Sequence, residues 1–185
     1  MSAPAYDVAV VGGGLVGAWT AYFLARRGRR VALVEKGSVG AQSSGVNFGN
    51  LRLQGRFPAQ YPLSLRAHEL WERLPELIGA SCEVERTGHL YCAFDAAEAE
   101  KLEGYAAASE AAGLAIERLD RMALARRFPW LAPKVVAATF SARDAVANPR
   151  LVTPATAQAA RRLGAEVLEG WEAVEARREG EGFAL

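Results

Sequence analysis

Two short apolar runs lie near the N-terminus, separated by a stretch with helical periodicity. The first run covers residues 8–11 and the second covers residues 31–34. Between them, large apolar side chains recur at the spacing of one helix face, and this pattern closes at Gly28. Apolar runs of this length are typical of strands that are covered on both faces of a parallel sheet. The pattern therefore predicts a strand, a helix and a second strand within one βαβ unit.

The junction between the first strand and the helix has the spacing G-x-G-x-x-G, formed by Gly12, Gly14 and Gly17. Gly12 permits the sharp turn, Gly14 lets a pyrophosphate approach the backbone, and Gly17 lets the helix pack closely. The amides of Leu15, Val16 and Gly17 open the helix, where the helix dipole favours an anion. These features predict a dinucleotide site.

The second strand ends on Glu35, where a carboxylate can accept hydrogen bonds from a ribose hydroxyl. An acid at this point disfavours a phosphorylated ribose, so NADP is not the expected ligand. The glycine spacing alone is weak, but a strand, a helix and an acid surround it at the expected distances. The alternative interpretation is a glycine-rich turn in another kind of α/β protein.

Residues 36–50 (KGSVGAQSSGVNFGN) form a loop of mostly small residues that leaves the second strand. Ligands of open α/β sheets bind outside the carboxyl ends of the strands, where this loop begins. It offers two glycines for close backbone approach and several hydrogen-bonding side chains: Gly45, Gly49, Ser43, Ser44, Asn47 and Asn50. We expect it to contact the same ligand; the alternative is a solvent-exposed linker.

The rest of the chain alternates between expected helices and strands. Periodicity predicts helices in residues 57–78, 96–112, 120–128 and 150–163, with Asp95 expected to cap the second and Asp120 to begin the third. Short apolar or alternating runs predict strands in residues 51–56, 89–94, 135–140, 165–168 and 171–178. The strand at 165–168 is expected to join the first two in one parallel sheet. The first of these helices is expected to bury a stripe made of Leu63, Ala67, Leu70, Trp71, Leu74 and Leu77.

The chain closes on an expected hairpin, whose turn is REGEG at residues 178–182. Its second strand would be only three residues long, which leaves unpaired edge groups. We therefore expect this sequence to be the N-terminal part of a longer protein.

Composition narrows the class of protein. The 185 residues are 51% apolar and 23% charged, as in an ordinary globular domain. The net charge of +1 gives no reason to expect a nucleic-acid partner. Cys82, Cys92, His68 and His89 lack the spacing of a metal site, so no metal and a reducing cytoplasmic location are expected. No secretory signal or transmembrane segment is expected from the sequence.

The unit from Tyr6 to Glu35, the loop SSGVNFGN and the segment around Asn148-Pro149-Arg150 together resemble FAD-dependent oxidoreductases of the D-amino-acid oxidase type. Similar proteins include glycine and sarcosine oxidases and the opine- or hydroxyproline-type amine dehydrogenases. The resemblance covers about the first half of a typical member. It implies a Rossmann-like α/β FAD-binding domain in residues 1–50 and 141–185, interrupted at 51–140 by the start of an α+β substrate domain.

The resemblance implies FAD contacts at three places. The residues at the pyrophosphate and the ribityl chain would be Gly12, Gly14, Leu15, Val16, Gly17, Ser43 and Ser44. Those at the adenosine end would be Glu35, Lys36 and, through the backbone of an expected strand, Val174. Those approaching the flavin ring would be Phe48, Gly49, Asn50 and Leu51.

The implied reaction is oxidation of the C–N bond of a small amine or amino acid to an imine, which water then hydrolyses. No residue is assigned as catalytic, because the family's substrate-holding residues lie mainly in the other half. Arg52, Tyr61 and His68 are candidates only, with His68 expected to be structural and Arg52 to be a surface residue. Two alternatives stay open: a NAD-dependent dehydrogenase, and an inactive truncated or split product that needs a partner chain.

Overall fold

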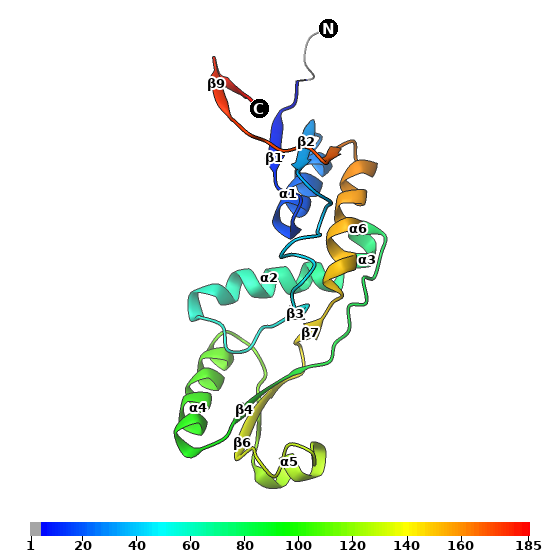
Figure 1. Cartoon of the computed structure of the whole chain (residues 1–185). Coiled ribbons are helices and arrows are strands. Elements are labelled where there is room, and N and C mark those ends of the chain that lie inside the picture. Colours follow the sequence, from blue (N-terminus) through cyan, green and yellow to red (C-terminus); the bar gives the residue numbers. More distant parts are fainter. Residues whose placement is uncertain (1–4) are drawn as a thin grey trace. The chain divides into compact units, whose positions relative to one another are not determined.

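The computed structural model describes residues 5–185, which divide into two compact units (Figure 1). The first unit comprises the chain up to Gly49, Leu74–Cys82 and Asn148–Leu185. The second unit comprises Asn50–Arg73 and Glu83–Ala147. The boundaries differ from the expected 51–140 insertion for two reasons. Residues 74–78 pack against a helix of the first unit, and residues 145–146 pair with a strand of the second.

The core of the first unit is a three-stranded parallel sheet. Its strands are β1 (Val8–Val11), β2 (Val31–Glu35) and β8 (Glu166–Glu169), in the order β1-β2-β8. Val8 is in register with Val31, and Ala32 is in register with Glu166. The predicted βαβ unit and its third parallel strand are therefore confirmed.

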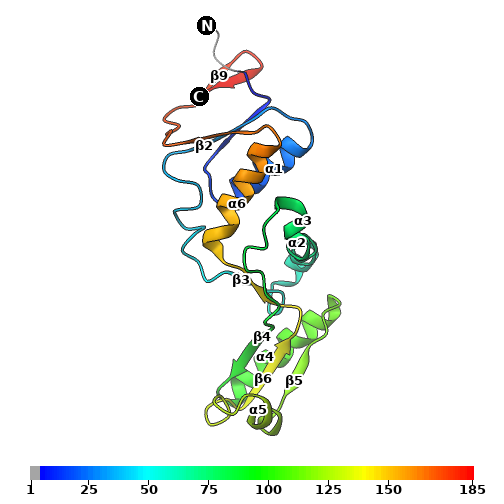
Figure 2. The same cartoon turned by 90° about the vertical axis from the view of Figure 1, so that its right-hand side faces the viewer.

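Two helices of the first unit, α1 (Leu15–Arg26) and α6 (Pro149–Arg162), pack side by side, as both views show (Figures 1 and 2). Their buried faces consist largely of alanines, which lets the two helix axes approach closely. The α6 helix begins one residue before the expected 150–163: the Asn148 side chain accepts a 3.0 Å hydrogen bond from the Arg150 amide, and Pro149 occupies the first helical position. The short α3 helix (Leu74–Ile78) contacts α6.

The segment after β8 corrects one expectation. No strand covers residues 171–176; only β9 (Arg177–Glu179) forms, and it pairs with β10 (Gly182–Ala184) in the predicted hairpin. Trp171 and Val174 are exposed, so this segment has no buried face of the kind that stabilises a strand. Its start is fixed instead by backbone hydrogen bonds from Gly170 to Gly37 and from Trp171 to Glu35.

The second unit is built on an antiparallel sheet in the order β4-β6-β5. Its strands are β4 (His89–Ala93), β5 (Glu117–Leu119) and β6 (Ala137–Ser141), with a small pair formed by β3 (Asn50–Leu51) and β7 (Ala145–Val146). Its helices are η1 (Pro58–Gln60), α2 (Tyr61–Glu72), α4 (Ala96–Ala111) and α5 (Arg121–Arg127). Asp95 and Asp120 cap α4 and α5 as predicted.

Three expectations for the second unit are wrong in detail. The strand expected at 51–56 shortens to β3, because the carboxylate of Asp144, rather than a neighbouring strand, accepts the amide of Leu53 at 2.7 Å. Strands β5 and β7 were not expected. The single helix expected at 57–78 is divided into η1, α2 and α3. In its expected apolar stripe, Leu63 is 75% exposed while Leu74 is fully buried, and α2 buries Tyr61 and His68.

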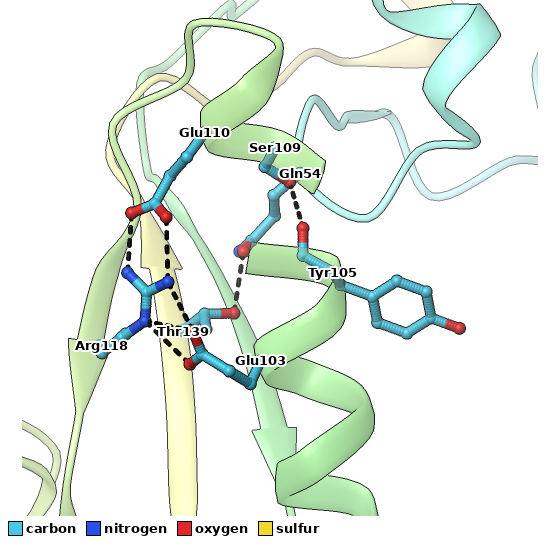
Figure 3. Close-up of polar contacts among 7 residues, drawn as sticks. All are labelled: Gln54, Glu103, Tyr105, Ser109, Glu110, Arg118 and Thr139. Atoms are coloured by element: carbon cyan, nitrogen blue, oxygen red, sulfur yellow. Dashed lines mark hydrogen bonds and ion pairs between the residues drawn. The ribbon is translucent and has the colours of Figure 1, made fainter. Parts of the chain in front are cut away.

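A charged cluster joins β5 to α4 (Figure 3). The Arg118 guanidinium bonds the carboxylates of Glu103 and Glu110 at distances from 2.6 to 2.9 Å. These bonds raise the pKa of Arg118 and hold the pKa of both carboxyl groups below its ordinary value. All three side chains are exposed to solvent, so the cluster links β5 and α4 at the surface of the unit and contributes little to its core.

Candidate dinucleotide site

The turn between β1 and α1 has the geometry that the glycine spacing predicts. Gly12 has a φ of +100°, a conformation that side chains disfavour, and its amide donates to the Val34 carbonyl at 2.8 Å. A Cβ on Gly17 would overlap the carbonyl oxygen of Gly12. The close approach at Gly17 is therefore made mainly to the turn itself, which keeps the start of α1 tight against the end of β1.

Ser44 lies over the N-terminus of α1. Its Oγ accepts a hydrogen bond from the Leu15 amide at 2.9 Å, although 29 residues separate the two. Gly14 occupies the cap position and has no side chain to satisfy that amide, and a Cβ there would lie 3.0 Å from the Ser44 hydroxyl. The structure thus brings together Gly14, Leu15 and Ser44, which the sequence predicted separately.

Glu35 links the turn to the following loop. Its Oε2 accepts the Gly13 amide at 2.7 Å, and its Oε1 accepts the Gly37 amide at 2.8 Å. The residue is only 8% exposed. An ionised carboxylate can accept about four hydrogen bonds, so these two amides leave acceptor capacity for ribose hydroxyls.

Gly13 is a site residue that the sequence reasoning did not assign. A Cβ at this position would lie 2.9 Å from the Glu35 Cβ and 3.0 Å from the Val39 Cγ2. Any side chain would therefore push Glu35 or the loop out of place. The signal was present as a run of three consecutive glycines, of which the fingerprint explains only two.

The other predicted contact residues lie in several places. Lys36 and Ser43 are exposed on the loop, and Phe48 is fully exposed. Gly49 closes the loop, its amide bonded to Asn47. Asn50 and Leu51 form β3 in the second unit, and Val174 lies exposed outside any strand. The structure therefore brings Gly12–Gly17, Glu35 and Ser44 together, and the assignment of all these residues to parts of FAD stays a prediction.

The three candidate substrate residues all belong to the second unit. His68 is buried and its Nε2 lies 2.8 Å from the Leu51 carbonyl, and the buried Tyr61 hydroxyl lies 2.6 Å from the Ser109 hydroxyl. Both are packing residues. Arg52 donates to the Tyr91 hydroxyl at 3.1 Å, and within residues 5–185 no carboxylate pairs with it.

Residues 5–185 contain neither a membrane-spanning helix nor a metal-binding cluster. Between residues 5 and 185, no helix is both long and apolar enough to cross a membrane. Over that part of the chain, no group of three or more His, Cys, Asp or Glu side chains could hold a metal ion.

Comparison with known families decides the class of protein. The sequence profile of the DAO family, described as FAD dependent oxidoreductase, matches residues 7–185. The chain belongs to this family. Its expected cofactor, FAD, is thereby confirmed as the cofactor of the family, and the mixed α/β fold agrees with the Rossmann-like domain expected from the sequence.

Two curated relatives are glycine oxidase of Geobacillus kaustophilus and monomeric sarcosine oxidase of Streptomyces avermitilis. The first is 30% identical over 97% of this chain and 50% of its own length, and the second is 32% identical over 89% and 43%. The crystal structure of the Geobacillus glycine oxidase superposes with a TM-score of 0.89, covering 96% of this chain and 50% of that one. The chain thus spans about half the length of these relatives.

The residues of the first unit fit the ADP part of FAD, that is, its adenosine and pyrophosphate. A Cβ on Gly12 would meet nothing within 4 Å, so the backbone of the turn faces open space that a pyrophosphate could enter. The N-terminus of α1 offers amides and a favourable dipole to a pyrophosphate. Glu35 keeps acceptor capacity for the ribose. FAD would therefore be held by Gly12–Gly17, Glu35 and Ser44.

Proposed function

We propose that the protein to which this chain belongs uses FAD to oxidise the C–N bond of a small amine or amino acid to an imine. The observation that carries the proposal is the Gly12–Gly17 turn with Ser44 over the start of α1, in a chain of the FAD-dependent family. The names of the two oxidases quoted above support an amino acid or a secondary amine as substrate. When bound, FAD supplies the acceptor for the hydride that leaves the carbon beside nitrogen.

The part of this chain in that reaction is to bind and orient. The remaining amides at the start of α1 and the Ser44 hydroxyl, which accepts from Leu15 and can donate its own hydrogen, hold the pyrophosphate, and Glu35 receives the adenosine ribose. Because Glu35 also bonds Gly13, the ribose and pyrophosphate contacts are fixed relative to each other. Neither cysteine forms a disulfide, which supports the proposal of a reducing compartment such as the cytoplasm.

We further propose that another polypeptide segment pairs with β1, either in the same longer protein or in a partner subunit. Among the strands of residues 5–185, β1 pairs with β2 only. It reads Val-Ala-Val-Val, and Ala9 and Val11 are exposed. An apolar edge strand without charged or proline residues is a site for further strand pairing, which supports this proposal.

The test is titration of the purified chain with FAD and with ADP, which is the pyrophosphate and adenosine part of FAD. Binding is followed by flavin fluorescence and by calorimetry. We expect both ligands to bind, and NAD to bind more weakly than FAD. Gly17→Val should weaken both ligands by at least about a hundredfold, since the side chain would displace the turn by overlapping the Gly12 carbonyl.

Gly104→Ala is the matched control. Gly104 lies within α4, and a Cβ there meets nothing within 4 Å. This variant should bind FAD as the wild type does and should be slightly more stable, because alanine favours helices. Failure of the wild-type chain to bind FAD or ADP, or equal binding by the Gly17→Val variant, would contradict the assignment of this turn.

A further inference from the structure

Two residues of the loop after β2, Val39 and Gly40, pack directly on the nucleotide turn. The Gly40 amide donates to the Gly13 carbonyl at 3.0 Å. Val39 is buried, and its Cγ2 would be 3.0 Å from a Cβ on Gly13. A Cβ on Gly45 would overlap the Gly40 carbonyl, so the part of the loop that carries Ser44 also packs on Gly40.

The opposite side of Gly40 contacts α6. Gly40 has a φ of +76°, and a Cβ there would lie 2.9 Å from the Thr153 Cβ and 3.3 Å from the Pro154 Cδ. Thr153 is completely buried, and its hydroxyl has no hydrogen-bond partner within residues 5–185. Thr153 therefore contributes here by steric packing and not by hydrogen bonding. Gly40 occupies a gap between the turn and α6 that admits backbone only.

Glu169, at the end of β8, bonds Val39, the residue that precedes Gly40. Glu169 Oε1 accepts the Val39 amide at 2.8 Å, and its Oε2 accepts from Arg161 of α6 at 2.9 Å. The Val39 amide first, and Arg161 next, hold the pKa of Glu169 below its ordinary value, so it is anionic at neutral pH. Glu169 also lies in register with Glu35 on the neighbouring strand. Two strand-end carboxylates thus bond three amides of the turn and loop: those of Gly13, Gly37 and Val39.

We propose that Val39–Gly40 is a spacer that sets the distance between the nucleotide turn and α6, which makes Gly40, Thr153 and Glu169 positioning residues for the cofactor. None of them needs to touch FAD. They act through Gly13, whose carbonyl and amide are bonded by Gly40 and Glu35. The inference rests on the proposed function only in taking FAD as the bound group.

The decisive comparison is between two glycine variants, Gly40→Ala and Gly88→Ala. Both positions have positive φ, and in both a Cβ would clash, with Thr153 at Gly40 and with the Phe140 ring at Gly88. Only Gly40 contacts the turn; Gly88 lies in the second unit. We expect Gly40→Ala to weaken ADP binding by about tenfold or more, and Gly88→Ala to stay within about threefold although it unfolds at lower urea.

Milder variants test the two supports separately. Adding Thr153→Gly to Gly40→Ala should recover part of the lost ADP affinity, because it removes both the Thr153 Cβ, which would lie 2.9 Å from the new methyl group, and the Thr153 Cγ2. Glu169→Ala should weaken ADP by about threefold to tenfold, and Glu169→Gln should restore most of the affinity, since its amide oxygen still accepts from Val39.

Hydrogen exchange of the Gly40 amide, measured without ligand, is the second readout. In Glu169→Ala this amide should exchange faster, because the spacer is released from one side. Equal loss of ADP affinity in Gly40→Ala and Gly88→Ala, or unchanged affinity in Gly40→Ala, would overturn the proposal. A wild type that binds no ADP would contradict the proposed function, and unchanged Gly40 exchange in Glu169→Ala would independently contradict the spacer.

Discussion

Two buried carboxylates, one in each unit, make similar bonds and serve different ends. Glu35 of the first unit is 8% exposed and bonds the amides of Gly13 and Gly37. Asp144 of the second unit is 0% exposed and bonds the Leu53 amide at 2.7 Å and the Ser141 hydroxyl at 2.5 Å. Within residues 5–185, neither carboxylate has a positively charged side chain in a salt bridge.

The difference lies in where each carboxylate sits in its fold. Glu35 ends a parallel strand beside the N-terminus of a helix, where ligands of α/β sheets bind, and it keeps unused acceptor capacity. Asp144 is buried in the loop between β6 and β7, strands that belong to different antiparallel pairs, and it bonds the backbone amides of residues 53–54. Burial of a carboxylate therefore does not by itself identify a binding site. The position of Glu35 at the end of a parallel strand is what supports its proposed role in binding.

The largest effect is expected for Asp144→Ala. Removing this acceptor leaves the Leu53 amide and the Ser141 hydroxyl buried without their partner, and each buried unsatisfied donor costs about 1–3 kcal/mol. We expect the free energy of unfolding to fall by about 3 kcal/mol, measured by urea denaturation. ADP affinity of the folded protein should change by less than about threefold, because the bonds described for Asp144 join it to residues of the second unit.

Asp144→Asn is the companion variant. It keeps one acceptor oxygen for the Leu53 amide, so we expect it to lose about half as much stability as the alanine variant. A stability loss in Asp144→Ala no larger than that of an exposed carboxylate, or a matching loss of ADP affinity, would remove the distinction between the two carboxylates.

Only one of these two carboxylates was predictable from the sequence. Glu35 lies at the expected distance from a glycine fingerprint within a single βαβ unit, so the strand, the glycines and the helix each support its assignment. Asp144 meets Leu53 across 91 residues, and the sequence around it indicates only a turn. The same long-range bond explains why the strand expected at 51–56 shortens to two residues.

The next effect in size is expected for Glu35→Ala. The buried Gly13 amide loses its acceptor, while the exposed Gly37 amide can turn to water, so the free energy of unfolding should fall by about 1–2 kcal/mol. ADP affinity should fall by at least about tenfold, because the ribose and the turn lose the same group. Glu35 would thus affect binding more than stability, the reverse of Asp144. Calorimetric titration together with urea denaturation gives both quantities.

Glu35→Gln sharpens this result. It retains one acceptor for Gly13 but places an amide N–H group where the ribose hydroxyl should donate. We expect most of the stability to return while ADP affinity stays low. Recovery of both quantities together would mean that Glu35 only supports the turn and does not meet the ribose.

Local patterns predicted those elements whose bonds are local. The caps of α4 and α5 follow from Asp95 and Asp120, each of which bonds an amide three residues on. The contact between Ser44 and Leu15, and the support of Gly13 by Gly40, depend on loop geometry that no periodicity encodes. The strand expected at 171–178 does not form over residues 171–176 for a different reason: the apolar residues there have no surface to pack against within residues 5–185.

The smallest effect is expected for the exposed cluster of Arg118, Glu103 and Glu110, which extends the comparison to surface carboxylates (Figure 3). Arg118 lowers the pKa of both glutamates. The two ion pairs therefore stabilise the fold at pH values above 4.5, the ordinary glutamate pKa, and this contribution is lost as the pH falls through the lowered pKa values. Arg118→Gln should therefore lower the melting temperature only slightly near neutral pH, and less still in high salt, which screens exposed charges. At acidic pH, where the glutamates are protonated, the variant and the wild type should melt together. A difference that persisted in high salt and at acidic pH would show that Arg118 stabilises the unit by packing its alkyl chain and not by charge.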